Sequence, residues 1–436
     1  MPIRLNSADK NFEADFANLL TMQRGQMADV TKIVADIIAD IRANGDKALL
    51  DLTAKLDGFD LTLDRLRIHT DEIEAAEVNC DPETLAALDM AATRITAFHT
   101  RQKPTDDYYT DELGLALGYR WQAVAAAGLY VPGGTANYPS SVLMNALPAK
   151  IAGVERLVMV VPCPQGEINP LVLAAARRAQ VDEIYRIGGA QAIAALAYGT
   201  QTIAPVNMIV GPGNAYVTEA KRQLFGQVGI DMLAGPSEIL IVADSTNDPS
   251  WIAADLLSQA EHDEAAQSIL LTDSTDFAEA VIDQIEAQLK TLPRADIARA
   301  SWQNCGAVIE VADIMTQAPP LIDRLAPEHV ALAIAEPDSL LAKIRNGGAF
   351  FLGHYTPEAI GDYIAGPNHV LPTNRSARYA SGLSVLNFMK RSTLMRANIE
   401  SLNALAPSAI KLAEAEKLSA HARSIAIRLN RKNGET

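Results

Sequence analysis

Residues 183–198 read Glu-Ile-Tyr-Arg-Ile-Gly-Gly-Ala-Gln-Ala-Ile-Ala-Ala-Leu-Ala-Tyr, and they decide the fold class of the chain. A short apolar run from Glu183 to Ile187 is followed by the turn Gly188-Gly189 and then by an alanine-rich helical stretch. Short strands that alternate with helices are typical of a parallel sheet with crossover helices. We therefore predict an α/β fold.

The same pattern begins after Trp121 and continues on both sides of this stretch. Glycine-rich turns recur at Gly133-Gly134 and at Gly211-Pro212-Gly213-Asn214. In open α/β sheets, turns at strand ends line the ligand crevice. The other strand candidates are Leu157–Val161, Met208–Val210, Ile239–Val242 and Ile269–Leu271.

The first third of the chain is predicted to be mainly helical. From Val30 to Ile41 apolar residues recur at helical spacing, and Asn44-Gly45 follows as a stop signal. His69 and His99 lie among polar residues without an acidic partner at a useful spacing. We expect both histidines on the surface.

Together these patterns predict two Rossmann-like α/β domains, a helical N-terminal region and a small helical C-terminal tail domain. We expect residues 1–25 to form an N-terminal arm. Residues 26–121 and 238–381 would form a discontinuous first α/β domain, and residues 122–237 the second. The remaining residues, 382–436, would form the tail, which is helical from near Asn387.

Composition excludes several classes of protein. The chain has 436 residues, 49% of them hydrophobic, which is enough to bury the cores of two or more linked units. Its net charge of -16 repels nucleic-acid phosphates and anionic membranes. The N-terminus lacks the apolar core of a signal peptide, and no run approaches the ~20 apolar residues of a membrane helix. We expect a cytoplasmic protein with no nucleic-acid or membrane partner.

The three cysteines, Cys80, Cys163 and Cys305, are widely spaced. An odd number at such spacing provides neither a disulfide framework nor a metal knuckle. We expect buried, reduced thiols.

The turn at Gly211-Pro212-Gly213 begins like a dinucleotide-binding fingerprint, but Tyr216 stands where the third glycine belongs. The turn is therefore either a nucleotide-binding loop or a plain tight turn. Tyr130 precedes another glycine-rich turn and could stack on a flat ring, or it could be a buried structural tyrosine.

Five of the seven histidines fall between residues 262 and 421. Gln259 and His262 lie three apart on a predicted helix and share one face as oxygen and nitrogen donors. An imidazole suits zinc, whereas the glutamine alone would not suggest a metal. Glu328-His329 is an adjacent carboxylate and imidazole that could divide acid and base work, or a solvated pair at a helix start.

Two further polar groups follow. Residues 356–369 are dense in carboxylate, glycine and imidazole, and contain Glu358, Asp362 and His369. Such density favours a binding loop, with a polar turn as the alternative. Glu416 and His421 lie five apart near the C-terminus, where by themselves they read as an ordinary amphipathic helix.

From about residue 25 to the tail, these segments together resemble the histidinol dehydrogenase family. The similar segments occur in the family's order: Gly-Leu-Tyr130-Val-Pro-Gly-Gly, Ile-Gly-Gly-Ala-Gln191-Ala-Ile-Ala-Ala-Leu-Ala, Val-Gly-Pro-Gly-Asn214-Ala-Tyr-Val, Ala-Gly-Pro-Ser237-Glu, Gln259-Ala-Glu-His262, Pro-Glu328-His329, Gly-Asp362-Tyr and Asn-His369-Val-Leu-Pro-Thr.

The resemblance implies a role for each matching residue. The zinc ligands would be Gln259, His262, Asp362 and His421. The NAD contacts, on the side of residues 122–237, would be Tyr130, Gln191 and Asn214. The substrate contacts would be Ser237, His329, Glu416 and the four metal ligands, with Glu358 and His369 near the same pocket.

The resemblance also implies the reaction, the oxidation of L-histidinol to L-histidine through histidinal with NAD. His329 would accept the alcohol proton, Glu328 would deprotonate the water that hydrates the aldehyde, and one zinc ion per subunit would position the substrate. Family members are homodimers whose tail crosses to the neighbouring subunit. Glu416 and His421 would therefore complete the partner's site.

Other readings compete with this one. A family relative could oxidise another polar alcohol, such as a sulfonated diol, although the pair Glu416 and His421 favours a substrate that contains imidazole. A zinc hydrolase could use Glu328 to activate water without a nicotinamide. A non-catalytic metal-binding protein would leave the adjacent pair Glu328-His329 unexplained.

Overall fold

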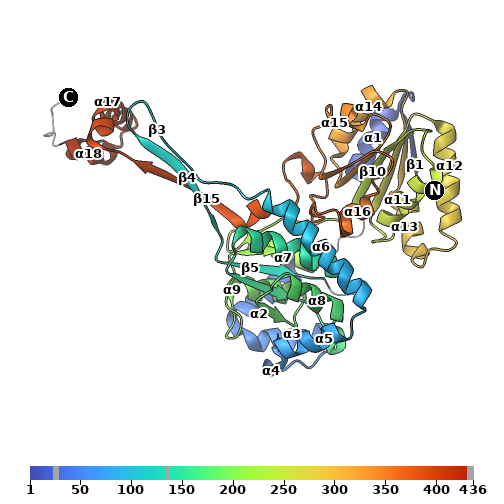
Figure 1. Cartoon of the computed structure of the whole chain (residues 1–436), viewed down its shortest axis with the longest axis horizontal. Coiled ribbons are helices and arrows are strands. Elements are labelled where there is room, and N and C mark those ends of the chain that lie inside the picture. Colours follow the sequence, from blue (N-terminus) through green and yellow to red (C-terminus); the bar gives the residue numbers. More distant parts are fainter. Residues whose placement is uncertain (23–28, 133–137, 430–436) are drawn as a thin grey trace. The chain divides into compact units, whose positions relative to one another are not determined.

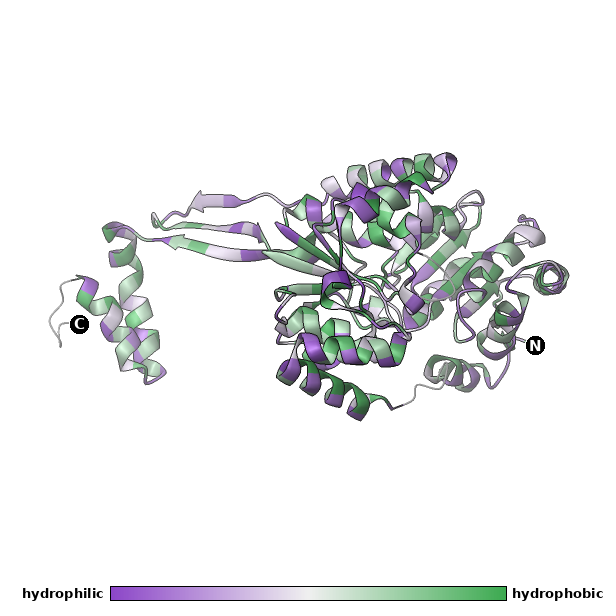
Figure 2. Cartoon of the chain, turned by 90° about the horizontal axis from the view of Figure 1, so that it is seen from below, coloured by the Kyte–Doolittle hydropathy of each residue, from purple (hydrophilic) through white to green (hydrophobic). Residues whose placement is uncertain are grey.

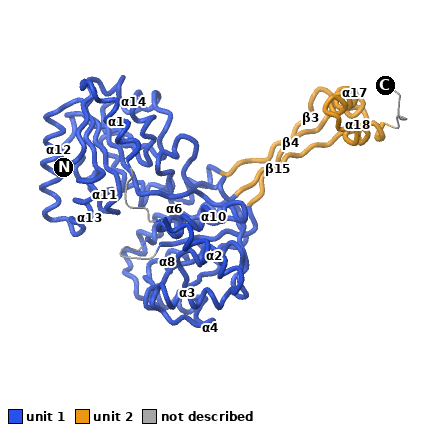
Figure 3. The backbone as a smooth tube through the Cα atoms, turned by 180° about the vertical axis from the view of Figure 1, so that it is seen from behind, with its two compact units in different colours: residues 1–102, 124–388 blue, residues 103–123, 389–436 orange. Residues whose placement is uncertain are grey.

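The computed structural model describes residues 1–22, 29–132 and 138–429, and the chain divides into two compact units (Figure 3). The first unit comprises residues 1–102 and 124–388, and the second comprises residues 103–123 and 389–436. The first unit contains two six-stranded sheets, and the second contains one three-stranded sheet. The turn predicted at Gly133-Gly134 lies outside the described residues.

The first sheet is entirely parallel, with strand order β1-β12-β11-β10-β13-β14. Its strands in chain order are β1 (Ile3–Asn6), β10 (Glu238–Ala243), β11 (Gln267–Thr272), β12 (Ala307–Glu310), β13 (His329–Ala333) and β14 (Ala349–Leu352). The helices of this half are α1 (Phe12–Thr21), α11 (Pro249–Ala260), α12 (Thr275–Gln288), α13 (Ala295–Cys305), α14 (Ile314–Leu325), α15 (Pro337–Leu341) and α16 (Glu358–Tyr363).

Helices cover both faces of the first sheet (Figure 1). One face packs against α1 and α14 and the other against α11, α12 and α13. Every residue of β10, β11 and β13 is buried, which explains why these strands are almost continuously apolar.

The second sheet has the order β2-β7-β6-β5-β8-β9 and is parallel except for β2, which pairs antiparallel with β7. Its strands are β2 (Arg67–Ile68), β5 (Ala126–Tyr130), β6 (Arg156–Val160), β7 (Glu183–Tyr185), β8 (Met208–Val210) and β9 (Gly229–Ile230). Its helices are α2 (Thr31–Asn44), α3 (Asp46–Asp57), α4 (Leu63–Leu66), α5 (Thr70–Val78), α6 (Pro82–Thr100), α7 (Pro139–Ala152), α8 (Pro170–Arg178), α9 (Gly189–Tyr198) and α10 (Ala215–Leu224).

The predicted α/β fold is confirmed, and each strand candidate corresponds to an observed strand within one or two residues at either end. The predicted helix from Val30 to Ile41 is α2, which ends at Gly45 with φ 53°. Of the two histidines expected on the surface, only one lies there. His69 is exposed as expected, but His99 is fully buried, so its placement on the surface was wrong.

The N-terminal segments lie elsewhere than expected. Residues 1–22 are not a separate arm, because β1 pairs with β12 and α1 packs into the core of the first sheet. The helical region 31–100 packs mainly on the second sheet rather than with residues 238–381, of which α6 contacts residues 364–368. Val34, Ile41 and Leu49 of its helices lie in the core of the second sheet, and β2 extends that sheet.

The second unit is not purely helical. It contains an antiparallel sheet of β3 (Asp107–Thr110), β4 (Ala116–Ala123) and β15 (Met389–Arg396), followed by α17 (Ile399–Ala415) and α18 (Ser419–Ala426). The predicted helical tail therefore starts with a strand. The short 3-10 helices among the described residues are η1 (Pro164–Gly166), η2 (Ser376–Arg378), η3 (Val385–Phe388) and η4 (Ile427–Leu429).

Two composition-based expectations can be compared with the structure. Cys163 and Cys305 are buried as expected, whereas Cys80 is partly exposed. In the described part of the chain, no helix has the length and apolar character needed to cross a membrane.

Candidate active site

The candidate site begins where two neighbouring strands of the first sheet start. β10 and β13 pair in parallel, with Ile239 opposite His329, so that Glu238 and Glu328 lie together at the amino edge. Glu328 accepts a hydrogen bond from the amide of Glu238 at 2.9 Å, and Glu238 accepts one from the amide of Glu328 at 3.3 Å. This reciprocal exchange satisfies two strand-end amides and fixes both buried side chains.

The ring of His329 is oriented by the same strand. Its Nδ1 lies 2.9 Å from the carbonyl oxygen of Glu238, which can only accept a hydrogen bond. Nδ1 therefore carries a proton, and in the neutral ring Nε2 is the basic nitrogen.

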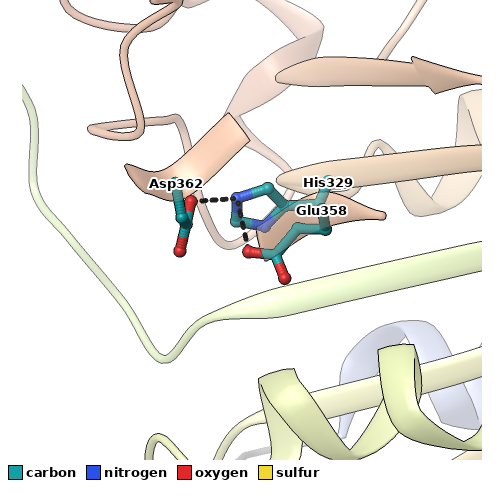
Figure 4. A group of neighbouring side chains, drawn as sticks. All are labelled: His329, Glu358 and Asp362. Atoms are coloured by element: carbon teal, nitrogen blue, oxygen red, sulfur yellow. Dashed lines mark ion pairs between the residues drawn. The ribbon is translucent and has the colours of Figure 1, made fainter. Parts of the chain in front are cut away.

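His329 Nε2 faces two carboxylates from α16 (Figure 4). It lies 3.7 Å from Glu358 Oε1 and 3.8 Å from Asp362 Oδ1. These two residues lie four apart, so one face of the short helix presents both. Ser258 of α11 hydrogen-bonds Glu358 at 3.3 Å, which connects the group to the helix that carries Gln259.

This cluster concentrates negative charge away from water. Burial raises the pKa of Glu328 to about 7, and burial together with the charge of Asp362 raises the pKa of Glu358 to about 8. Burial opposes ionisation of Asp362, but the neighbouring His329, His369 and Glu358 together outweigh burial and lower the pKa of Asp362 to about 2. Burial likewise lowers the pKa of His329, yet the carboxylates, Glu328 foremost, raise it to about 10. The raised pKa values show that the buried carboxylates are stabilised by positive charge, which either a proton or a bound metal ion can supply.

The polar atoms fit a bound metal ion. His329, Glu358 and Asp362 each offer a ligand atom, all within 4.8 Å of one another. Glu358 Oε1, His329 Nε2 and Gln259 Oε1 are buried without a hydrogen-bond partner among the described residues. Buried polar atoms are normally satisfied, so three orphans in one region call for a ligand. Their oxygen and nitrogen chemistry suits zinc without thiolates.

His262 lies just beyond the end of α11. Part of its surface is open to solvent, but the surrounding protein desolvates the imidazole and lowers its pKa, against the charge of Asp362. A neutral imidazole is the form that binds metals. Its electrostatic contact with Asp362 and His329 brings His262 to the same region as the cluster.

His369 connects this region with the second sheet. Its Nδ1 lies 2.9 Å from the carbonyl of Asp362, and its Nε2 lies 3.2 Å from Ser141 Oγ in the first turn of α7. The preceding residue, Asn368, donates a hydrogen bond from its side-chain amide to the carbonyl of Met144 at 2.6 Å. The loop after α16 is therefore held by the helix that follows β5.

The three residues expected to contact NAD all lie at the carboxyl edge of the second sheet. Tyr130 ends β5, and its hydroxyl accepts a hydrogen bond from the amide of Gly189 at 3.2 Å. Gln191 is buried in the first turn of α9, and its Oε1 has no partner among the described residues. Asn214 is the N-cap of α10 and accepts from the amide of Tyr216 at 3.1 Å.

A buried ion pair braces the turn that leads to Asn214. Lys221 pairs with Asp231, and both side chains are almost fully buried. Lys221 donates to the carbonyl of Gly211 at 3.0 Å, and Asp231 accepts from its amide at 2.8 Å. Gly211 has φ 109°, and a Cβ there would lie 2.2 Å from the carbonyl oxygen of Tyr130. Only glycine fits, which explains the glycine-rich turn.

The remaining expected residues are more scattered. Ser237 directly precedes β10, and its carbonyl accepts from the amide of Gln267 at 2.9 Å. Glu416 is the C-cap of α17, and His421 lies on α18; both are exposed and belong to the second unit.

Sequence reasoning missed Glu238 and Ser141. Glu238 stands beside Ser237 in a segment quoted for the family resemblance, but nothing local shows that it exchanges hydrogen bonds with a residue 90 positions away. Ser141 starts an apolar helix and carries no charge. Only the tertiary fold brings it to His369.

Comparison with known proteins identifies the family. A family model described as "Histidinol dehydrogenase" matches residues 20–429. Histidinol dehydrogenases of Rhodospirillum rubrum and Rhizobium meliloti are 62% and 61% identical to the chain, and each alignment covers 99% of both proteins. The crystal structure of histidinol dehydrogenase from Elizabethkingia anophelis matches with a TM-score of 0.94 at 37% identity, covering 98% of each chain. The chain therefore belongs to the histidinol dehydrogenase family of oxidoreductases.

Proposed function

We propose that this protein oxidises L-histidinol to L-histidine through histidinal, with NAD as the hydride acceptor in both steps. The observation that carries the proposal is the position of Glu328 and His329. Both are fixed by hydrogen bonds to the backbone of Glu238, and both lie beside Glu358 and Asp362, which could hold a metal ion together with His329. The names of the similar proteins support the substrate.

The residues of the chain divide the proton transfers between them. In the first oxidation His329 Nε2 takes the alcohol proton, since Nδ1 is already committed to the carbonyl of Glu238. Against the effect of burial, the carboxylates by themselves raise the pKa of His329 to about 10, and a cation bound among them would lower that pKa and leave Nε2 free to act as a base. Water then adds to the aldehyde carbon: Glu328 takes a proton from that water, and His329 returns its proton to the carbonyl oxygen, which gives the hydrate and leaves Nε2 free again. The hydrate loses its second hydride, and a hydroxyl proton again goes to His329, which leaves the carboxylic acid. NAD, when bound, supplies the acceptor for each hydride.

The metal proposed for the site is one zinc ion per subunit, held by Gln259, His262, Asp362 and His421. When bound, zinc supplies a positive charge that orients an imidazole and an amine of the substrate. The orphaned Gln259 Oε1 and the carboxylates around His329 support this assignment. Glu358 lies close enough to Asp362 and His329 to serve either the metal or the substrate.

NAD is assigned to Tyr130, Gln191 and Asn214. Substrate contacts are assigned to Ser237, His329, Glu358, His369 and Glu416, in addition to the metal ligands. These residues follow the carboxyl ends of β5, β7 and β8 in the second sheet. Parallel α/β sheets bind nucleotides at this edge, which supports the assignment.

A homodimer with shared sites completes the proposal. Among the described residues of the second unit only Ser401, Ala406 and Ala422 are buried, and both apolar and polar residues run along α17 and α18 (Figure 2). Met395 is 75% exposed and Leu412 is 66% exposed. Exposed apolar side chains of this kind are expected at an interface. The odd number and wide spacing of the cysteines support a cytoplasmic location.

Substrate competition tests this function. L-Histidinol with NAD should give NADH absorbance and histidine, whereas a sulfonated diol should give little. Turnover of the diol in place of histidinol would favour a relative with another substrate. Hydrolysis of an ester or amide without any change in nicotinamide absorbance would favour a zinc hydrolase.

Metal removal gives the first prediction about a particular site. Because the assigned ligands are nitrogen and oxygen atoms without thiolate, a chelator should strip the metal and abolish activity, and zinc should restore it. Elemental analysis must accompany the assay. Full activity in protein shown to be metal-free would contradict the assignment.

A further inference from the structure

The second sheet has the strand order of a dinucleotide-binding sheet. Along the chain, β5, β6, β7, β8 and β9 are its first to fifth parallel strands, and in space they run third, second, first, fourth, fifth. In sheets of this type, a carboxylate near the end of the second strand hydrogen-bonds the 2′-hydroxyl of the adenosine ribose and distinguishes NAD from NADP.

The second strand of this sheet ends without such a residue. β6 is followed by Val161, Pro162 and Cys163, none of which is acidic. The next carboxylate is that of Glu167, which follows η1 and is exposed. The expected acidic residue is missing from its usual place in the sequence.

Asp57 brings a carboxylate to this place from α3. It is the last residue of that helix, and Gly58 follows with φ 62°. Burial raises the pKa of both Cys163 and Tyr130 to about 12, and the charge of Asp57 adds to both shifts. The carboxylate of Asp57 therefore lies near the ends of both β6 and β5.

The adjoining chain holds Asp57 at this position. Phe59 is buried and lies against η1, since a Cβ on Gly166 would come within 2.7 Å of its ring. Arg65 lies over the same ring, 5.1 Å from its centroid. The turn after α3 is thus packed on the segment that follows β6.

The Asp57 carboxylate has an unused acceptor. Its Oδ2 is buried and has no hydrogen-bond partner among the described residues, and burial raises its pKa. Arg186, whose charge also acts on Cys163, is engaged elsewhere: it pairs with Glu72 and donates to the carbonyl of Arg65 at 2.8 Å. A buried acceptor that is left unpaired destabilises the free protein, so a ligand that donates to it gains affinity.

We propose that Asp57 binds the 2′-hydroxyl of the adenosine ribose of NAD and thereby selects NAD over NADP. The inference rests on the proposed function, in which NAD is the cofactor. A ribose hydroxyl would supply the donor that Oδ2 lacks. The 2′-phosphate of NADP has no such hydroxyl and would bring its negative charge against the carboxylate.

The test compares Asp57→Asn with Asp60→Asn, a matched control whose carboxylate lies three residues away and is exposed. Calorimetry on the full-length protein should show NAD affinity about 10- to 100-fold lower in Asp57→Asn, the range for a lost hydrogen bond to a charged group. NADP affinity should stay level or rise. Without NAD, Asp57→Asn should melt at a higher temperature than the parent, with a smaller gain from NAD. The control should match the parent in every measurement.

A ligand change tests the same contact without relying on a variant. The parent protein should bind NAD that lacks the adenosine 2′-hydroxyl about 10- to 100-fold more weakly, and Asp57→Asn should barely distinguish this analogue from NAD. Equal binding of both ligands by the parent would overturn the assignment of Asp57, as would unchanged NAD affinity in Asp57→Asn or a lower melting temperature without NAD. Failure of the parent to bind NAD at all would instead overturn the proposed function.

Discussion

At the scale of single residues, the proposed function depends on two neighbours that are both held by the backbone of Glu238. Glu328 is held by the amide of Glu238, and His329 by its carbonyl, so one strand end orients both side chains. The pKa of Glu328, raised to about 7 by burial, suits a group that exchanges protons near neutral pH. A buried pair fixed by backbone hydrogen bonds can act without rearranging.

Glu328→Gln should separate the two half reactions. The amide keeps the size of the side chain but cannot take a proton from water, so histidinal oxidation should slow by about 10²–10⁴-fold, typical of a lost general base. Alcohol oxidation should suffer less, because His329 serves that step. Stopped-flow assays started separately from histidinol and from histidinal would measure both rates. Glu336→Gln, exposed after β13, is the control, and equal losses in the two steps would show that the division of roles is wrong.

Local sequence patterns do not reveal the tertiary surroundings of a single residue. His99 was expected on the surface because its neighbours are polar, yet it is buried. Its Nδ1 lies 2.7 Å from Gln102 Oε1, and Asn368, 269 positions away, lies 3.5 Å from Nε2. No local pattern can reveal that a polar histidine will find distant partners in a core.

At the scale of elements, the residues assigned to the site lie at opposite edges of the two sheets. The residues assigned to NAD follow the carboxyl ends of β5, β7 and β8, as strand-end turns predict. Glu328 and His329 instead lie at the start of β13, and Gln259 near the end of a helix that runs back toward that edge. The general rule for α/β sheets therefore predicts one half of the site and not the other.

The helix α11 contains a carboxylate whose burial works against stability. Burial raises the pKa of Asp255 to about 6, above its value of about 4 in an unfolded chain. A raised carboxyl pKa gives full stability below pH ~4, and that stability is lost as the pH rises through about 6.

Asp255→Asn should remove this loss. At pH 8 the variant should exceed the parent in free energy of unfolding by up to about 3 kcal/mol, and the gap should close toward pH 4. Urea unfolding at several pH values measures it, with Asp283→Asn on the exposed side of α12 as the control. A variant that is less stable than the parent at pH 8 would show that the Asp255 carboxylate is paired rather than merely buried.

The packing of the N-terminal helices shows another limit of the sequence. Periodicity identified α2 and its end at Gly45 because an apolar stripe and a glycine stop are local signals. It did not show that this stripe covers the second sheet, since an amphipathic helix reveals which face is buried but not what buries it.

At the scale of the whole molecule, the assigned residues fall in two separate units. Gln259, His262 and Asp362 belong to the first, and Glu416 and His421 to the second. The second unit buries little of its own apolar surface. A tail that completes the site of a partner subunit would account for both facts.

Subunit exchange tests that arrangement. His262→Ala would remove a zinc ligand from the site of its own subunit, and His421→Ala would remove one from the site of the partner subunit. Each homodimer should therefore be inactive. Mixed dimers would contain one intact site, and random exchange should restore about a quarter of the parent activity, since half of the dimers each have one of two sites. If mass spectrometry verified exchange and no activity returned, His421 would act within its own chain or would not be a ligand.

The central claim is that one site carries out two successive oxidations. The most direct measurement is the number of NADH molecules formed per histidine when purified protein turns over L-histidinol. A single site in which Glu328 hydrates the retained aldehyde and His329 serves both oxidations predicts two NADH per histidine, with no free histidinal. One NADH per histidinol consumed, with histidinal released into solution, would contradict it.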